Sequence, residues 1–195
     1  MTALLTAEGL NPNQVARRSR VLEAAVDLAV EGGYDAVQMR DVAARAQVAL
    51  GTIYRYFASK DHLLAECLLE TWRGMSERLE QRPLEGTTAS ERVIDLVRRL
   101  MRRVADRPEL TAALVTASSS PDPAVRDCQR EQVALQSAVF VGAMEDLDPD
   151  RAEEIARTLR LVWFATLLGW VNGWHDLDSV GLEFEAAVHL LLDAR

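Results

Sequence analysis

Cysteine is scarce in this sequence. Only two of its 195 residues are cysteines, Cys67 and Cys128, and each lies within a helical pattern. So few cysteines make a disulfide framework improbable, and buried free thiols are the usual state in a reducing compartment. The sequence therefore indicates a cytoplasmic protein.

Long apolar runs are also missing. The most apolar stretch, LVWFATLLGWVNGW at residues 161–174, is shorter than the roughly 20 apolar residues that a membrane-spanning helix needs. The first ten residues, MTALLTAEGL, contain neither a basic segment nor a long apolar run, so they do not resemble a signal peptide. We expect a soluble protein that has no membrane partner.

The signatures of common enzyme classes are absent as well. The sequence contains no G-x-S-x-G elbow, no P-loop and no dinucleotide-binding glycine fingerprint. His62 and Glu66, like Glu185 and His189, are spaced i,i+4, but no third ligand is positioned along the sequence to complete a metal site. We therefore predict a protein that is not an enzyme and that has no cofactor or metal.

Glycine and proline are few, with 10 and 6 residues, while 49% of the chain is apolar. No segment alternates apolar and polar residues for long, and apolar residues recur at intervals of three and four, as they do along one face of a helix. The sequence predicts an all-α fold with a packed core. About nine helices are expected, near residues 14–31, 39–46, 49–56, 60–81, 88–105, 108–118, 123–145, 149–174 and 182–192.

Capping and turn residues mark several ends of these helices. A glycine pair ends a helix readily, Ser or Asp caps a helix start, and Pro is well placed in a first turn. Thr followed three residues later by Glu is a capping box. These signals are Gly32-Gly33, Ser59, Thr88 with Glu91, Pro108, Asp122-Pro123 and Asp148-Pro149.

The negative charge is confined to the later part of the chain. The net charge is −8, yet residues 1–62 contain seven basic and seven acidic residues, whereas the remainder contains 15 and 23. The first part is therefore the only region that is electrostatically tolerable beside DNA phosphates.

Residues 46–60, AQVALGTIYRYFASK, crowd small, aromatic and basic residues into one segment. Two short helices joined by a tight turn, after a longer helix, describe a helix-turn-helix. Gly51 lets the backbone approach DNA, and Thr52 offers a hydroxyl where helix-terminal amides attract phosphate. Leu50 is expected either to pack inward or to contact a thymine methyl group. Ile53 and Phe57 are expected to anchor the second helix.

The segment GGYDAVQMRDVAARAQVALGTIYRYFASKDHLL resembles the DNA-binding signature of the TetR family of transcriptional regulators. The resemblance spans about residues 20–64 and implies an N-terminal three-helix DNA-binding domain, which we place at residues 1–58. It also implies a helical ligand-binding and dimerisation domain, at residues 59–195. Gln38 stands where a capping Thr is usual and Gln47 where a turn Gly is usual, so a weaker cap and a strained turn are expected.

Within that family, GGYDAVQMRDVA, VALGTIYRYFASK and VWFATLLGWV resemble the actinobacterial repressors of cholesterol catabolism. This closer resemblance implies a response to a coenzyme A thioester of a steroid acid. The predicted function is a repressor that a bulky apolar ligand, of the steroid or fatty acyl-CoA class, releases from a palindromic operator in duplex DNA. The alternative is an all-helical small-molecule binding protein or enzyme without specific DNA binding, which would leave the composition of residues 46–60 unexplained.

The resemblance implies DNA contacts at matching positions of the helix-turn-helix, and Arg side chains near the N-terminus add candidates for backbone or minor-groove contacts. The alternatives are that Tyr54 packs, that Arg17 and Arg18 are solvated, and that Lys60 is an ordinary surface lysine. The predicted DNA-binding residues are Arg17, Arg18, Gln38, Arg40, Leu50, Gly51, Thr52, Tyr54, Arg55, Tyr56 and Lys60, with Arg20 as a further candidate.

The two last predicted helices are apolar around more of their circumference than a one-sided helix needs. They are expected to form a four-helix, two-fold interface in a homodimer, which also places two recognition helices one DNA turn apart. The alternative is that all of these residues belong to the core of one chain. The predicted interface residues are Trp170, Val171, Trp174, Phe184, Val188 and Leu191.

A ligand cavity is expected among the helices of the later part, chiefly because the family resemblance implies one. Met and aromatic side chains suit an adaptable apolar pocket, although at helical spacing they are more often plain core. The predicted lining residues are Trp72, Met75, Leu79, Leu100, Met101, Leu114, Phe140, Met144, Trp163 and Leu167. Arg98, Arg99, Arg102 and Arg103 are either a solvated helix face or the receptor of a ligand's phosphates.

Overall fold

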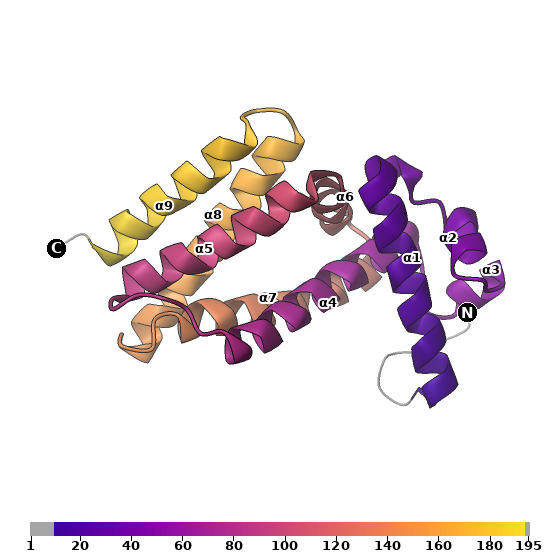
Figure 1. Cartoon of the computed structure of the whole chain (residues 1–195), viewed down its shortest axis with the longest axis horizontal. Helices are drawn as coiled ribbons and strands as arrows, with labels where there is room; N and C mark the ends of the chain where they lie inside the picture. Colours follow the sequence, from indigo (N-terminus) through magenta and orange to yellow (C-terminus); the bar gives the residue numbers. More distant parts are fainter. Residues whose placement is uncertain (1–9, 194–195) are drawn as a thin grey trace. The chain divides into compact units, whose positions relative to one another are not determined.

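The computed structural model describes residues 10–193, and every regular element in that range is a helix (Figure 1). The all-α prediction is confirmed. No helix in the described range is both long and apolar enough to cross a membrane. The elements are α1 (Pro12–Ala36), α2 (Met39–Arg45), α3 (Leu50–Ile53), α4 (Lys60–Gln81), α5 (Ala89–Asp106), α6 (Pro108–Ser118), α7 (Pro123–Gly142), α8 (Pro149–Val171) and α9 (Leu177–Leu192).

Helix α1 begins earlier than the expected start at Gln14. The Asn11 side chain accepts a hydrogen bond from the Gln14 N–H at 3.0 Å, and the Gln14 side chain accepts one from the Asn11 N–H at 2.9 Å. This reciprocal pair satisfies two backbone donors that a helix start leaves unpaired, and Pro12 needs no such partner. The glycine pair interrupts the helical backbone as expected, since Gly33 has a φ of 68°.

Helix α9 begins five residues before the expected 182. The Asp176 carboxylate accepts hydrogen bonds from the Ser179 N–H at 2.9 Å and from the Ser179 hydroxyl at 2.7 Å, so it caps the helix at that point. The expected caps at Ser59 and Thr88 are confirmed. Ser59 Oγ accepts from the His62 N–H at 3.1 Å, and Thr88 forms the capping box with Glu91.

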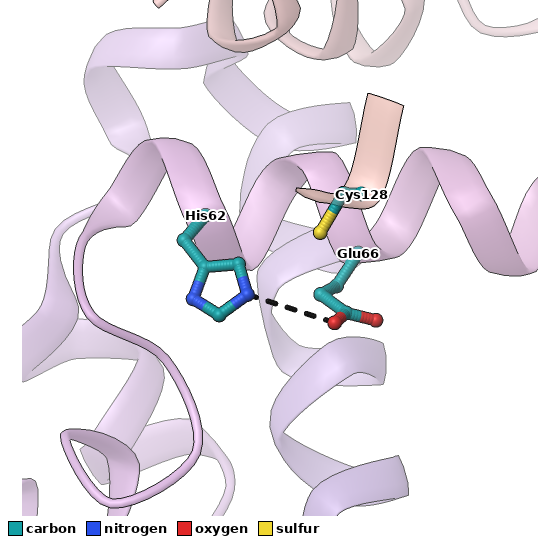
Figure 2. Close-up of side chains that lie close together, drawn as sticks. All are labelled: His62, Glu66 and Cys128. Carbon is teal, nitrogen blue, oxygen red and sulfur yellow. Dashed lines mark ion pairs between the residues drawn. The ribbon is translucent and has the colours of Figure 1, made fainter. Parts of the chain in front are cut away.

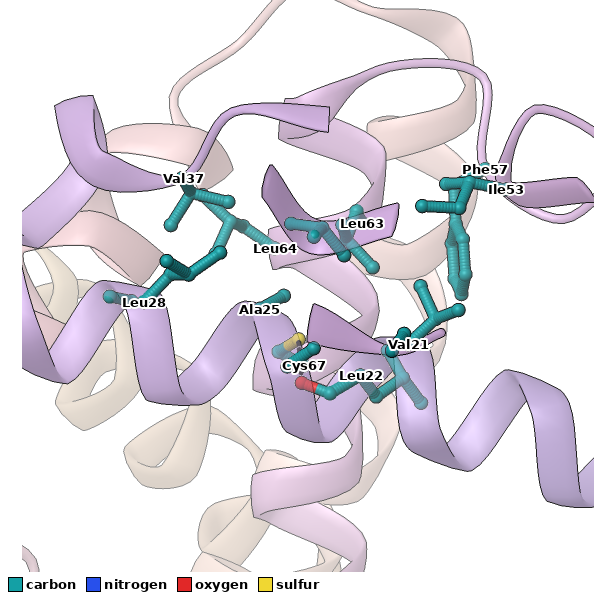
Figure 3. Packing of buried hydrophobic residues seen from close by; sticks show 14 of the residues in the cluster. Val21, Leu22, Ala25, Leu28, Val37, Ile53, Phe57, Leu63, Leu64 and Cys67 are labelled. Atoms are coloured by element: carbon teal, nitrogen blue, oxygen red, sulfur yellow. Dashed lines mark hydrogen bonds between the residues drawn. The ribbon is translucent and has the colours of Figure 1, made fainter. Parts of the chain in front are cut away.

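The first of two compact units consists of Met1–Glu70 and Pro108–Arg130. Helix α1 packs on α6, and side chains from α1, the loop after it and α4 meet in one apolar cluster (Figure 3). Val21, Val37, Ile53, Phe57 and Leu63 are fully buried in it. Each large apolar side chain buried in this way stabilises the fold by about 1.5–3 kcal/mol. The cluster therefore fixes the short helices α2 and α3 on a rigid support.

The second unit consists of Thr71–Arg107 and Glu131–Arg195, and in it α9 packs against both α5 and α8. The Phe184 ring of α9 stacks on Phe140 of α7 at a centroid distance of 6.1 Å and meets Trp163 of α8 edge to face at 5.7 Å. Such aromatic pairs add about 0.5–1.5 kcal/mol each beyond the apolar area that they bury. Helices α4 and α7 each supply residues to both units.

Candidate nucleic-acid interface and effector region

The turn between α2 and α3 is built without glycine. Gln47 has a φ of 53°, in the left-handed region, while the Val48 N–H donates to the Ala43 carbonyl at 3.0 Å to close the end of α2. Left-handed backbone costs an L-residue roughly 1–2 kcal/mol, so this turn carries the strain that a glycine would avoid. The Gln38 side chain makes no cap for α2, and it donates instead to the Asp35 carbonyl at 2.8 Å.

Helix α3 and the turn after it, residues 50–57, have one side directed inward and one side directed to solvent. Ile53 and Phe57 are fully buried, which agrees with their expected anchoring role, and Leu50 packs against the same cluster. Tyr54 is 49% exposed, Gly51 and Arg55 are exposed, and Thr52 is half-buried. A Cβ atom added to Gly51 would meet nothing within 4 Å. The backbone at Gly51 is therefore open to close approach by another molecule.

Tyr56 lies differently from its neighbours, because its side chain is only 5% exposed. Its ring lies beside that of Phe57, with centroids 6.2 Å apart. Tyr56 therefore has little surface to offer to DNA, whereas Tyr54 is 49% exposed.

The Arg18 side chain forms ion pairs within its own chain. Its guanidinium donates to Glu66 Oε2 at 2.5 Å and to Glu70 Oε1 at 3.2 Å, and it lies over the Phe57 ring at 5.7 Å. The side chain is 11% exposed. The pairing of α1 with α4 accounts for Arg18, so we remove this residue from the predicted DNA surface.

All of the remaining basic candidates except Lys60 are exposed. Arg17, Arg40 and Arg55 are exposed, and none has a hydrogen-bond or ion-pair partner among residues 10–193. Lys60 is half-buried, with its ammonium 3.6 Å from the centre of the Tyr34 ring and 3.2 Å from the Tyr34 carbonyl oxygen. Arg20 is exposed and donates weakly to the Ala46 carbonyl at 3.4 Å. The exposed cations lie on α1, α2 and the segment after α3.

Nine of the ten predicted ligand-lining residues belong to the second unit. Trp72, Met75, Leu100, Phe140, Met144, Trp163 and Leu167 are buried there, and Leu79 and Met101 are half-buried. Leu114 is the exception. It lies in the apolar cluster of the first unit, because α6 packs on α1, so we remove it from the predicted lining.

The predicted dimer residues divide into two groups. Phe184 and Val188 are fully buried inside their own chain, so they offer no surface to a partner and we remove them from the interface. Trp170, Val171 and Leu191 are half-buried, and Trp174 is 74% exposed.

Four further apolar side chains on α8 and α9 are exposed. They are Leu161, Phe164, Leu182 and Leu190. Residues 161, 164, 168 and 171 recur at helical spacing, as do 182, 186 and 190, so a periodicity signal for this face was present in the sequence. Sequence alone does not single out this face, because the inward-facing residues of both helices are equally apolar.

The four arginines of α5 differ in their partners and in their exposure. Arg98 pairs with Glu185 at 3.2 Å, and Arg99 pairs with Asp95 at 2.6 Å and donates to the carbonyls of residues 82 and 83. Arg102 is exposed. Partial burial lowers the pKa of Arg103, and the neighbouring charges of Arg78 and Arg107 lower it further.

A polar cluster in the first unit joins residues that are far apart in the sequence. Figure 2 shows His62 and Glu66 of α4 with Cys128 of α7, all directed toward one point. Their potential ligand atoms lie within 4.8 Å of one another. Along the sequence no third ligand is positioned to complete a site with His62 and Glu66, and the fold places Cys128 beside them, although its position in α7 carries no local signal.

Hydrogen bonds and ion pairs orient the side chains of this cluster and determine that Glu66 is charged. His62 Nδ1 accepts from the Ala58 N–H at 3.0 Å, and Nε2 faces Glu66 Oε1 at 3.6 Å. Burial by itself would raise the pKa of Glu66, but the hydrogen bond from His62 and the charge of Arg18 outweigh it, and the pKa lies below the usual range. Glu66 is therefore a carboxylate that donors on three helices surround.

Comparison with known proteins matches two segments of the chain to protein families. Residues 21–67 match the family described as "Bacterial regulatory proteins, tetR family", and residues 86–191 match the "Tetracyclin repressor-like, C-terminal domain". The chain is similar to the HTH-type transcriptional repressor KstR of Mycolicibacterium smegmatis, with 36% identity over 177 residues, which cover 90% of this chain and 87% of that protein.

Solved structures agree with this assignment. A TetR transcriptional regulator from Rhodococcus sp. RHA1 superposes with a TM-score of 0.80 at 30% identity, covering 92% of this chain and 97% of that one. The FadR repressor of Thermus thermophilus, solved in complex with lauroyl-CoA, has the same fold, with a TM-score of 0.71 at 23% identity and coverage of 89% and 92%.

Proposed function

The chain belongs to the TetR family of bacterial regulatory proteins, and we propose that it represses transcription until a bulky apolar effector releases it from DNA. The family is regulatory, so the prediction that the chain is not an enzyme is confirmed, and the alternative of a binding protein or enzyme without DNA contacts is not supported. A regulator of this kind acts in the cytoplasm, where the chromosome lies.

The exposed face of α3 is the observation that carries the DNA-binding part of this proposal. Gly51 and Arg55 are exposed, Tyr54 is 49% exposed and Thr52 is half-buried, on α3 and the turn that follows it, while the buried Ile53 and Phe57 anchor this segment from the other side. A rigid short helix with small and hydrogen-bonding side chains outward suits insertion into the major groove. Gln38, Arg40, Arg17 and Lys60 would then contact phosphates on either side.

A homodimer supplies the second recognition helix. The exposed apolar residues of α8 and α9 form the face that we assign to the partner copy, with Trp170, Val171, Trp174 and Leu191 beside them. Two copies related by a two-fold axis would present two α3 helices to a palindromic operator.

The effector site is proposed within the second unit. Its buried Trp72, Met75, Met144 and Trp163 are large, adaptable apolar side chains of the kind that line hydrophobic ligand pockets. KstR is a named repressor relative and FadR binds lauroyl-CoA, so we extend the acyl-CoA class, including steroid acyl-CoA thioesters, to this chain. Arg102 and Arg103 are the candidates for the ligand's phosphates, since Arg98 and Arg99 have carboxylate partners.

Release requires a difference in affinity between two states. An effector shifts the population only if it binds the state with the wrong recognition-helix spacing more tightly. Helix α4 is continuous from the first unit into the second, so it is the element through which such a shift would reach α3.

Fluorescence anisotropy with duplex DNA from the gene's own upstream region tests the proposal. We expect tight, salt-sensitive binding that a steroid or fatty acyl-CoA thioester reverses, with the matching free acid and free coenzyme A as controls. Binding that no thioester reverses would discard the effector class. If neither this duplex nor any fragment from a genome-wide selection binds, the repressor proposal fails.

A further inference from the structure

We infer that His62, Glu66 and Cys128 form a binding site for a divalent transition-metal ion of the zinc type. They are the one group of three metal-ligand side chains found within residues 10–193, and they offer one nitrogen, one oxygen and one sulfur atom. Zinc binds imidazole, carboxylate and thiolate together, at bond lengths of about 2.0–2.3 Å that place neighbouring ligand atoms about 3.3–3.6 Å apart. The separation of 3.6 Å between His62 Nε2 and Glu66 Oε1 already falls in that range.

The Glu66 carboxylate is already oriented for metal binding by its neighbours. The Arg18 guanidinium pairs with Glu66 Oε2 at 2.5 Å, so the other oxygen, Oε1, is the one that faces His62. A hydrogen-bonded partner on the second oxygen of a ligand carboxylate fixes its orientation, as outer-sphere residues commonly do in metal sites. Three protein ligands leave a fourth position of a tetrahedral ion to water.

The ion would replace two protons that hold the cluster together. In the metal-free chain His62 Nδ1 accepts a hydrogen bond, so the neutral ring carries its proton on Nε2, which faces Glu66 Oε1 at 3.6 Å, and the Cys128 thiol lies beside the same two groups. On binding, the thiol proton leaves to solvent, the imidazole proton moves from Nε2 to Nδ1, and both freed lone pairs coordinate the ion. The thiolate and the carboxylate then neutralise the two positive charges, while Arg18 keeps its second carboxylate partner, Glu70.

Metal binding is thereby coupled to the turn beside α3. His62 Nδ1 accepts the Ala58 N–H at 3.0 Å in the metal-free chain. Once Nδ1 carries the proton, two donors face each other and this hydrogen bond is lost. Ala58 lies between α3 and Lys60, so metal binding loosens the segment that supports the proposed DNA surface. This last step rests on the proposed function, whereas the metal site itself does not.

Cobalt(II) titration of the purified, reduced protein tests the site without DNA. One equivalent should give the visible absorption of tetrahedral cobalt with a sulfur-to-metal charge-transfer band, and zinc should abolish both by displacement. Cys128→Ala and the similarly sized Cys128→Ser should lose the charge-transfer band. Cys67→Ala is the matched control, since Cys67 is equally buried but not part of the group, and it should keep the band.

A wild-type protein without the tetrahedral spectrum would overturn the inference, as would a charge-transfer band that survives in both Cys128 variants. The coupling is read by operator anisotropy, in which zinc should weaken binding by about tenfold, the equivalent of one hydrogen bond, and should have no effect on Cys128→Ala. Unchanged operator affinity with zinc bound would refute the coupling. Failure of DNA binding altogether would refute the proposed function and leave the cobalt result standing.

Discussion

At the scale of single residues, those proposed to contact DNA can be distinguished from those that stabilise the fold. Gly51 is the clearest case, because a Cβ atom there has open space around it in the isolated chain. The fold of the chain therefore does not require a glycine at this position, and we expect that close approach of a DNA backbone to α3 does.

Gly51→Ala should leave the fold intact or stabilise it by up to about 1 kcal/mol, since Ala favours helix over Gly. We expect operator affinity to fall by about tenfold or more, because the added methyl group would separate backbone and phosphate. Gly142→Ala, at another glycine whose Cβ would meet nothing, is the control and should leave DNA binding unchanged. Equal operator affinity for both variants would remove Gly51 from the interface.

Asp95 gives a pH-dependent contribution to stability. It accepts a hydrogen bond from the Glu85 N–H at 2.9 Å and pairs with Arg99 at 2.6 Å. Burial by itself would raise the pKa of Asp95, but these partners outweigh it and hold the pKa below its usual value of 3.8. The stabilisation is therefore fully present above the unfolded-state pKa and is lost as the pH falls through the lower folded-state pKa.

Asp95→Asn should lower the free energy of unfolding by about 1 kcal/mol at pH 7. The difference from wild type should shrink as the pH falls below 3.8. Urea denaturation at several pH values measures it, with Asp127→Asn, in an exposed pair with Arg130, as a control of little effect. A difference that does not change with pH would contradict the assignment to the charged carboxylate.

At the scale of elements, neighbouring side chains on one helix have different tasks. Arg17 and Arg18 are adjacent on α1, yet Arg17 is exposed while Arg18 reaches two carboxylates of α4. The pair of α1 and α4 is thus tied by charge as well as by the apolar cluster of Figure 3.

Arg18→Met should cost about 3 kcal/mol of stability, because it leaves Glu66 charged and partly buried without its cation. Arg17→Met should leave stability unchanged but reduce the salt dependence of operator binding by about one phosphate contact. Thermal unfolding and anisotropy at several salt concentrations distinguish the two. The reverse pattern, with Arg18→Met stable and defective only in DNA binding, would show that the ion pairs contribute little.

Helix α9 illustrates why an apolar helix cannot be assigned to an interface by composition. Its Phe184 packs between Phe140 and Trp163 inside the second unit. Phe184→Ala should therefore destabilise the chain by about 3–5 kcal/mol through the cavity it leaves. Sedimentation of the folded fraction should show an unchanged dimer, and dissociation without loss of stability would return Phe184 to the interface.

At the scale of the whole molecule, the proposed dimer depends on outward residues of α8 and α9. Leu190 is 74% exposed and Leu182, also on α9, is 69% exposed, so together they form an apolar patch that the proposed partner would cover. Because a two-fold interface contains each residue twice, a single substitution acts twice.

Leu190→Glu should weaken the dimer on the order of a hundredfold or more, since two apolar contacts of about 2 kcal/mol are lost together. Operator binding should fall with it, as only a dimer spans both half-sites. Sedimentation equilibrium measures the effect, and Val133→Glu, at an exposed apolar residue of α7, is the control. A dimer as tight as wild type would place the interface elsewhere.

Much of this protein is determined locally, and local features can be read from sequence. The helices follow from apolar spacing and from caps such as Thr88 with Glu91, which act within one or two turns. The segment around Tyr54 carries its own signal for DNA binding, because its composition is wrong for a core and is set by what lies outside the chain. The start of α9 differs from the expected residue 182, because its cap, Asp176, is a weaker sequence signal than the glycine and proline residues that mark other helix ends.

The tertiary structure alone decided which side chains meet across long separations. Arg18 finds Glu66, and Cys128 joins His62, only because α1, α4 and α7 pack together, and no spacing along the chain encodes those contacts. The same holds for Phe184 and Leu190, which are both apolar residues of α9. Burial against neighbouring helices makes one a core residue and leaves the other at the surface, and hydrophobicity, which is not directional, cannot distinguish them in advance.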